Sequence, residues 1–293
     1  MPISFEKVSL DPQEVVSEQL HILIVLIRDL LYSSESTRVV ISHRFWEEEM
    51  AKPRNRDPRR ILRHGYKVYS QNEEDGIVEE IFRRIGEGRK TFVEIGVEDG
   101  NENNTARLLV DGWSGTWIEA SHDFVANIRK DIVPGYEGRL AVKHAKATPD
   151  NVNGLIGTGN IDLLSIDVDF NDYWIWKAID ARPRVVVVEY NATWHPPMSV
   201  TVPYDDRGCQ IPGFINTNYF GASLEALVCL GREKGYRIVG CGFAGINAFF
   251  VREDLVGDKF LEPATAGEHY EPPRYRIPFL SGHAGALGAL TRV

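Results

Sequence analysis

The chain has few cysteines, no long apolar run and no signal-like start. Its 293 residues include three cysteines, Cys209, Cys229 and Cys241, with no C-x-x-C spacing among them. This excludes a zinc knuckle and a disulfide framework, and it predicts a reducing, cytoplasmic setting. The longest apolar run is Ile22 to Ile27, far below the roughly 20 residues that cross a bilayer. The N-terminus also lacks the basic start and small-residue cleavage site of a signal peptide.

Positive charge is also in short supply. The formal net charge is -9 at pH 7, whereas general nucleic-acid binding needs a basic face that displaces counterions. The hydrophobic share of 43% and the charged share of 26% are those of an ordinary globular protein. We therefore expect one large α/β domain with an appendage, and no nucleic-acid or membrane partner.

Strand and helix patterns alternate along most of the chain. Apolar segments of strand length recur between helical patterns, and the fifth is apolar on both faces, as a strand inside a parallel sheet must be. Such alternation predicts a doubly wound α/β fold. A helix over residues 223–233 precedes two last strands whose short glycine-containing link indicates an antiparallel hairpin. The first two expected strands lie within residues 91–100, where the strand ends at Glu94, and within residues 112–121, where it ends at Glu119. The other five are residues 140–145, 161–166, 184–190, 235–240 and 247–252.

Regions outside this alternation form an appendage at each end. Residues 1–63 are expected to form a helical extension, whose first helix begins after Asp11 and is apolar around its whole circumference at Ile22 to Ile27. Such a helix is buried or meets another subunit, so we expect a homo-oligomer. The basic, turn-rich residues 53–60 read as a solvated linker before a domain over residues 64–253. Residues 254–293 are rich in proline and glycine and are expected to be an irregular flap over the site.

The first predicted strand ends in the pattern E-x-G-x-x-x-G, formed by Glu94, Gly96 and Gly100. Glycine is needed where backbone turns sharply or lies against a ligand. A carboxylate in this loop would repel a pyrophosphate but would suit a cationic ligand. Glu119 ends the second strand, 23 residues beyond Gly96, and a carboxylate about 20 residues past such a loop commonly accepts hydrogen bonds from ribose hydroxyls.

This combination resembles the class I S-adenosylmethionine (SAM) dependent methyltransferases over about residues 66–253. The resemblance implies a seven-stranded Rossmann-like sheet of order 3-2-1-4-5-7-6 with strand 7 antiparallel, and SAM as cofactor. It also implies that Glu94, Gly96 and Gly100 border the methionine part of SAM and that Glu119 holds its ribose.

Within that superfamily the chain resembles the FkbM-like methyltransferases, many of which methylate sugar hydroxyls. The resemblance rests on Ser70–Gln71 with Glu74–Asp75, on Gly112–Trp113 and on Gly235–Tyr236. It implies that Gln71 closes the cofactor pocket and that the acceptor is a sugar or a similar polar molecule. Residues Asp167–Asp172 depart from the Asp-x-x-Gly-x-Glu run that is usual after strand 4.

Oxygen-bearing side chains follow the fourth and fifth strands. Asp167 and Asp169 come after one strand, and Glu189 and Asn191 come after the next. Neighbouring parallel strands deliver these residues to one rim, where oxygen ligands suit a divalent cation such as Mg²⁺ or Mn²⁺. The sequence therefore predicts a metal held by Asp167, Asp169 and Glu189, with Asp167 also acting on the acceptor. The same cluster could instead hydrogen-bond a polar acceptor without metal.

His195 is the candidate general base, because a neutral imidazole titrates near working pH and the residue lies on the loop beyond the fifth strand. A third metal ligand and an ordinary surface residue are the alternatives. Asp167-Val168-Asp169 also matches the D-x-D of metal-dependent nucleotide-sugar glycosyltransferases. That alternative leaves Glu94 and Glu119 unexplained. A non-catalytic module that binds a partner through its N-terminal helices is the third interpretation.

Overall fold

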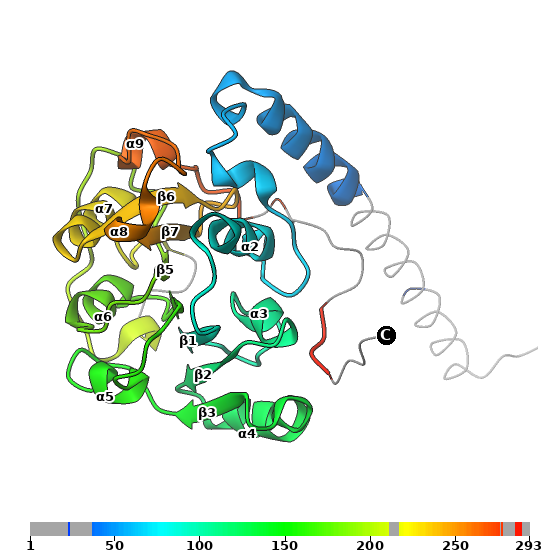
Figure 1. The fold of residues 1–293 in the computed structure, drawn as a ribbon, viewed down its shortest axis with the longest axis vertical. Helices are drawn as coiled ribbons and strands as arrows, with labels where there is room; N and C mark the ends of the chain where they lie inside the picture. The colour runs from blue at the N-terminus through cyan, green and yellow to red at the C-terminus, as the bar shows by residue number, and fades with distance from the viewer. Residues whose placement is uncertain (1–22, 24–36, 211–216, 276, 278–284, 289–293) are drawn as a thin grey trace, which may run out of the picture.

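A computed structural model describes residues 23, 37–210, 217–275, 277 and 285–288 of the chain. It contains one seven-stranded sheet of order β3-β2-β1-β4-β5-β7-β6 (Figure 1). Strands β1 to β5 are parallel to one another, and β7 pairs antiparallel with both β5 and β6. The predicted doubly wound methyltransferase sheet, with its antiparallel seventh strand, is therefore confirmed. Its strands are β1 Thr91–Ile95, β2 Ser114–Glu119, β3 Leu140–His144, β4 Leu163–Ile166, β5 Val185–Glu189, β6 Tyr236–Cys241 and β7 Asn247–Arg252.

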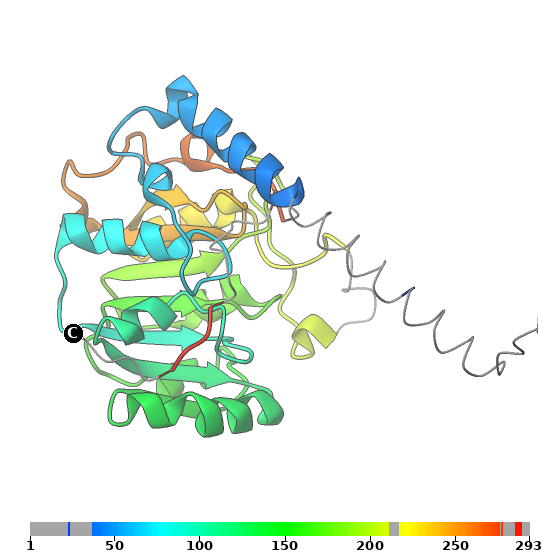
Figure 2. The ribbon, with the colours of Figure 1, turned by 90° about the vertical axis from the view of Figure 1, so that its right-hand side faces the viewer.

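Helices cover both faces of this sheet (Figures 1 and 2). The first face packs against α5 (Val152–Ile156), α6 (Asp172–Ala178) and α7 (Leu224–Glu233) in one apolar cluster. The second face packs against helices from the first half of the chain in a separate cluster. These helices are α2 Glu74–Ile85, α3 Ala106–Val110 and α4 His122–Asp131. Elsewhere in the chain, short 3₁₀ turns cover Pro53–Asn55, Ile61–His64, Val133–Tyr136 and Gly208–Gln210.

The run of valines in β5 forms a strand that is buried from solvent on both faces of the sheet. All four, Val185 to Val188, are fully buried, and they alternate between the two apolar clusters because successive side chains of a strand point to opposite faces. Branched side chains at Cβ suit this pleated setting. A strand of this kind needs helices on both faces, and the doubly wound fold supplies them.

The described residues 37–63 pack on the β6/β7 end of the sheet. Among the described residues a helix covers 37–51, and its Phe45 and Trp46 rings contact Phe243 with ring centroids 5.8 and 5.0 Å apart. The following segment, residues 53–60, is mostly exposed, but two of its residues are buried. Arg60 is buried and donates to the carbonyls of Arg54 and Glu268, so this segment docks on the C-terminal part of the chain. The predicted helix of residues 11–32 lies outside the described residues.

The C-terminal region is more regular than its composition suggested. It contains α8 (Glu253–Val256) and α9 (Ala266–His269), whereas proline and glycine content alone predicted irregular structure. Tyr190, at the end of β5, donates a hydrogen bond of 2.7 Å to the carbonyl of Glu271, which holds this region against the sheet. In the part of the chain that the structure describes, no helix has both the length and the apolarity needed to span a membrane.

Gly115 in β2 tests the packing between the sheet's central strands. A Cβ there would lie 2.2 Å from a ring carbon of Phe92 and 2.4 Å from its carbonyl oxygen. We expect Gly115→Ala to lower the free energy of unfolding by about 1–3 kcal/mol, as overpacking does. Urea denaturation followed by circular dichroism measures this. Gly154→Ala is the control, because a Cβ at that position in α5 meets nothing within 4 Å. Equal stability of the two variants would contradict the packing argument.

Candidate functional site

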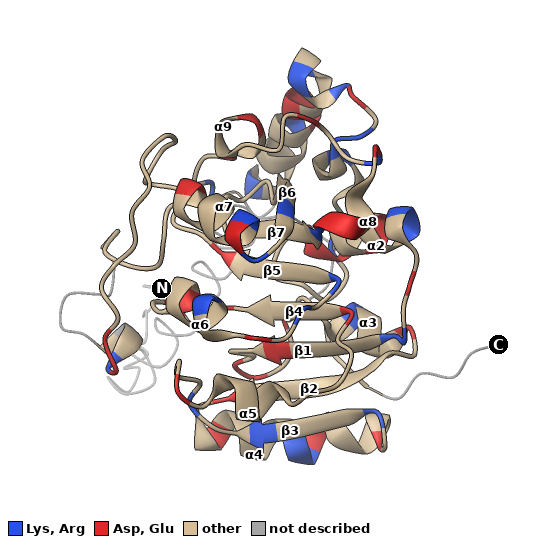
Figure 3. Cartoon of the chain, turned by 60° about the vertical axis from the view of Figure 1, so that its left-hand side comes forward, with Lys and Arg blue, Asp and Glu red and all other residues tan. Residues whose placement is uncertain are grey.

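A cavity of about 970 Å³ opens at the carboxyl edge of the parallel strands. It lies where β1, β2, β4 and β5 end, and Figure 3 shows acidic residues at the ends of β1 and β5. Open α/β sheets bind their ligands at this edge. The cavity brings together most of the predicted site residues, namely Gln71, Glu94, Gly96, Glu119, Asp167, Asp169 and Glu189.

Glu94 fixes the far end of the loop that follows β1. Its buried carboxylate accepts hydrogen bonds from the backbone N–H groups of Asn104 and Thr105, at 2.9 and 3.1 Å, and from the Thr105 hydroxyl. Burial raises the pKa of Glu94 to about 7, although these donors act in the opposite direction. The residue therefore positions the loop and the start of α3, and only part of its carboxylate surface is left for a ligand.

Glu119 fixes the near end of the same loop. One carboxylate oxygen accepts from the N–H groups of Val97 and Glu98 at 3.1 and 3.0 Å, and the other accepts from Ser121 N–H at 2.7 Å. A carboxylate has about four acceptor positions, so these three bonds leave capacity for one more donor. Because Glu119 lines the cavity, that donor can be a ligand hydroxyl.

The two glycines of the loop have different surroundings. Gly96 has φ +79°, and a Cβ there would lie 1.6 Å from the carbonyl oxygen of Asp167. Only glycine allows the loop to pass this close to the end of β4. Gly100 has φ +84°, but its missing Cβ faces Ile132 and Trp117, and the residue does not line the cavity. Its position serves packing beneath the loop.

Gln71 reaches the cavity from a segment that Asp75 organises. One carboxylate oxygen of Asp75 accepts from the N–H groups of Val68, Tyr69 and Ser70 at 2.6, 2.7 and 3.0 Å. This gives a physical role to an acidic residue that the sequence had flagged only by resemblance. Because the three bonds fix the backbone just before Gln71, its side chain is presented to the cavity from the α2 side.

Three carboxylates meet at the ends of β4 and β5. Asp167, Asp172 and Glu189 each contribute an oxygen within 4.8 Å of the others. Burial and mutual repulsion raise the pKa values of Asp167 and Glu189, and burial raises that of Asp172 to about 7. Among the described residues, Asp172 Oδ2 and Glu189 Oε2 have no hydrogen-bond partner. Buried acceptors of this kind need a proton or a cation.

Asp172, rather than Asp169, lies together with Asp167 and Glu189 in this cluster. Asp169 is exposed, with φ +62°, and it lines the cavity without joining this cluster. Asp172 is fully buried at the first turn of α6, where its Oδ1 accepts from Val168 N–H at 2.8 Å. In the sequence, the position of Asp172 five residues after Asp167 was the only indication that it would join the carboxylate cluster.

The loop after β5 directs its side chains away from the cavity. His195 is exposed, lies outside the cavity lining, and its Nε2 is 3.4 Å from the Tyr270 hydroxyl. Asn191 is buried, and its amide donates to the carbonyls of Asn218 and Phe220. Sequence reasoning missed Tyr275, which lines the cavity and whose pKa is raised to about 12 by burial and by Glu189.

Glu94→Gln tests the loop anchor. The new amide NH₂ would face either the Thr105 or the Asn104 donors, so at least one buried hydrogen bond is lost. We expect the free energy of unfolding to fall by about 1–3 kcal/mol, measured by thermal or urea denaturation. Glu87→Gln is the matched control, because its carboxylate and its partner Lys90 are both 46% exposed and such pairs contribute little. A Glu94→Gln variant as stable as the control would refute the anchoring role.

Comparison with protein-family models and with curated protein sequences finds no match. Among solved structures, the chain is similar to an O-methyltransferase family protein from Burkholderia thailandensis at 13% identity, over 61% of this chain and 57% of that one, with a TM-score of 0.38. The N-terminal domain of EvdMO1 with S-adenosylhomocysteine bound is similar at 12% identity over 62% and 80% of the two chains, with a TM-score of 0.41. Magnesium protoporphyrin IX methyltransferase from Synechocystis PCC 6803, also with S-adenosylhomocysteine bound, is similar at 12% identity over 78% of this chain and 99% of that one, with a TM-score of 0.38. At this distance the similarities concern the fold alone.

Proposed function

We propose that the protein is a SAM-dependent O-methyltransferase that acts on a hydroxyl of a sugar or a similar polar molecule. The observation that carries this proposal is the cavity at the carboxyl edge of the 3-2-1-4-5-7-6 sheet, where the loop after β1 meets the carboxylates at the ends of β4 and β5. The Gly96 backbone lies against Asp167, so a ligand on the loop and a ligand on the carboxylates would be neighbours. Methyl transfer requires such a juxtaposition of donor and acceptor.

The cofactor half of the cavity suits a cationic nucleoside. When bound, SAM supplies an electrophilic methyl carbon on a sulfonium. In our proposal Glu119 uses its remaining acceptor position for a ribose hydroxyl, while Gln71 and the backbone beside Gly96 border the methionine part. The wall after β3 is less polar, and Phe124, Ala145 and Ala147 line it. That wall provides an apolar surface for a purine ring.

The acceptor half combines carboxylates with an aromatic ring. Asp167 faces the cavity from the end of β4, and Tyr275 faces it from the C-terminal region. We propose that Asp167 accepts a hydrogen bond from the acceptor hydroxyl and holds it toward the methyl group. Tyr275 offers a ring face to a sugar, a common contact in carbohydrate sites. His195 keeps only its sequence-based candidacy as general base, because its side chain lies outside the cavity lining.

The carboxylate cluster fits a divalent cation such as Mg²⁺ or Mn²⁺. Its three oxygens lie within 4.8 Å of one another, and two buried oxygens in the set have no partner in the described chain. Hard oxygen ligands of this type are the ones such ions prefer. We propose Asp167, Asp172 and Glu189 as the ligands, with Asp172 in the place predicted for Asp169. A cation there would lower the pKa of a bound hydroxyl.

The cofactor assignment predicts that Glu119→Ala weakens S-adenosylhomocysteine binding by about 1.5–3 kcal/mol, the scale of lost charge-assisted hydrogen bonds. Calorimetry on the purified chain measures this. Asp123→Ala is the control, because that carboxylate is exposed in the next helix and points away from the cavity lining. Unchanged affinity in Glu119→Ala would remove Glu119 from the cofactor site. Tight binding of UDP with no binding of S-adenosylhomocysteine would instead support the glycosyltransferase interpretation.

The metal assignment predicts that metal-stripped protein binds Mn²⁺ in calorimetry. Asp172→Asn should abolish this binding, because it removes a negative charge and one of three ligands, while its Oδ1 can still accept from Val168 N–H. Asp169→Asn is the matched control and should bind Mn²⁺ like the unmodified chain. EDTA should abolish methyl transfer to a sugar panel and leave S-adenosylhomocysteine binding intact. Full transfer in EDTA, or loss of Mn²⁺ binding only in Asp169→Asn, would overturn this ligand set.

A further inference from the structure

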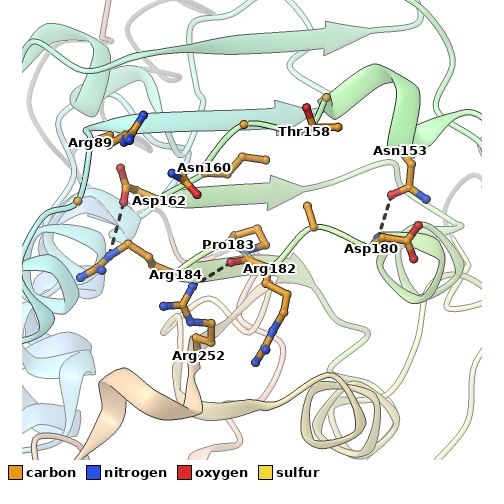
Figure 4. Close-up of a pocket in the computed structure, with 15 residues that line it drawn as sticks. Arg89, Asn153, Thr158, Asn160, Asp162, Asp180, Arg182, Pro183, Arg184 and Arg252 are labelled. Carbon is orange, nitrogen blue, oxygen red and sulfur yellow. Dashed lines mark hydrogen bonds and ion pairs between the residues drawn. The ribbon is translucent and has the colours of Figure 1, made fainter.

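A second cavity lies at the opposite, amino edge of the sheet (Figure 4). Its volume is about 610 Å³, which is within the range of small-molecule sites. It is built where the chain enters β1, β4 and β5 and where the antiparallel β7 ends. None of the residues assigned above to cofactor, acceptor or metal contributes to it.

Arginine dominates the charge of this cavity. Four arginines line it, against two aspartates, in a protein whose net charge is -9. Asp162 is already engaged, because it accepts from Thr91 N–H at 3.0 Å and lies 3.5 Å from Arg184 Nε. The four arginines are Arg89, Arg182, Arg184 and Arg252.

Two of the arginines are held in place by the protein. Arg184 donates to the carbonyls of Ile85 and Gly86 at 3.0 and 2.9 Å. Arg252 forms a bidentate pair with Asp254 and donates to the carbonyl of Arg182 at 3.2 Å, a bond drawn in Figure 4. These bonds hold both guanidinium groups at the floor of the cavity. Arg252 uses all three of its nitrogens in them, whereas the buried Arg184 Nε has no hydrogen-bond partner among the described residues and lies 3.5 Å from Asp162.

The other two arginines are available. Arg89 and Arg182 are exposed, and neither side chain has a hydrogen bond or ion pair within the described part of the chain. They lie on different sides of the cavity in Figure 4, from the turn before β1 and the turn before β5. A ligand that contacts both must therefore carry more than one negative group.

A glycine-containing turn forms the remaining wall. A Cβ built at Gly157 or at Gly159 would meet nothing within 4 Å, and Gly157 has φ +77°. The backbone of residues 157–160 therefore borders open space, with Thr158 and Asn160 directed along the cavity in Figure 4. Exposed backbone N–H groups in turns add to the attraction of arginine for phosphate.

We propose that this cavity binds a small molecule with two or more linked phosphates. Arg89 and Arg182 would contact the phosphates, since guanidinium groups match phosphate oxygens in bidentate geometry. Thr158 and Asn160 would donate further hydrogen bonds. The occupant is either an inorganic polyphosphate or the diphosphate group of a nucleotide, and the two share this chemistry. Asp180 lies at the far end beside Asn153, which directs the anionic part toward the arginine end.

The proposal is independent of the proposed methyltransferase function. Asp162 stands just before β4 and Asp167 just after it, so about 16 Å of strand separates the two cavities at roughly 3.3 Å per residue. Saturation with S-adenosylhomocysteine should therefore leave phosphate binding in place.

The test is calorimetry at low ionic strength with pyrophosphate, tripolyphosphate, ADP and inorganic phosphate. We expect pyrophosphate or ADP to bind at least about tenfold more tightly than inorganic phosphate, because a second linked phosphate can contact a second arginine of the cavity. The Arg89→Ala/Arg182→Ala double variant should lose about tenfold or more in affinity, the consequence of lost charge-assisted hydrogen bonds. Stronger binding of ADP than of pyrophosphate would identify a nucleotide, and the reverse order would identify a polyphosphate.

Arg38→Ala/Arg44→Ala is the matched control. It removes the same two charges from exposed positions on the helix of residues 37–51, and it should bind pyrophosphate like the unmodified chain. Equal losses in both double variants would show a non-specific charge effect and overturn the proposal. If none of the linked phosphates binds, the proposal is overturned. Displacement of bound pyrophosphate by S-adenosylhomocysteine would overturn it as well. Thermal denaturation of each variant establishes that it is folded.

Discussion

The buried carboxylate of Glu94 is the interaction on which the candidate site depends. It stands on the central strand and accepts the first N–H groups of the segment that begins α3. The Thr105 hydroxyl that donates to it also accepts from Trp117 Nε1 at 2.8 Å, which extends the connection to β2. Together with the three N–H groups bound by Glu119, these bonds determine the shape of the loop that forms one wall of the cavity. Two side chains that resemble ligand contacts in the sequence are thus first of all determinants of backbone shape.

A single backbone approach joins the two halves of the cavity. The loop passes Gly96 against the carbonyl of Asp167, so the loop after β1 and the acidic rim are in direct contact. The rim in turn rests on α6, whose first residue, Asp172, is tied to Val168 N–H. This arrangement suits a reaction that needs two ligands in a fixed relative position.

The sequence predicted the sheet well because local patterns determine it. Apolar alternation located each strand, and the valine run of β5 indicated burial on both faces. Local patterns in the sequence do not determine contacts between distant segments, so these contacts were not predicted. Asp169 follows Asp167 in the spacing of a metal site, but it has a positive φ and lies outside the carboxylate cluster, which Asp172 at the start of α6 completes. His195 is directed outward because Asn191 bonds to residues near 220, and Tyr275 arrives from the far end of the chain. Arg89, Arg182 and Arg252 likewise come to line one cavity only when the strands are assembled into the sheet.

The unequal distribution of charge around the main cavity affects how quickly ligands arrive. Its lining holds acidic residues in large excess over the basic Lys146 and Arg207. A concave surface of one sign focuses its electric field into solvent, raises the encounter rate of oppositely charged ligands and slows those of like charge. The field extends over roughly one Debye length, about 8 Å at physiological ionic strength. Association of a cationic ligand would thus slow as salt increases, even where its equilibrium contacts inside the cavity are unaffected. The acidic residues concerned are Glu94, Glu98, Asp99, Glu102, Glu119, Asp167, Asp169 and Glu189.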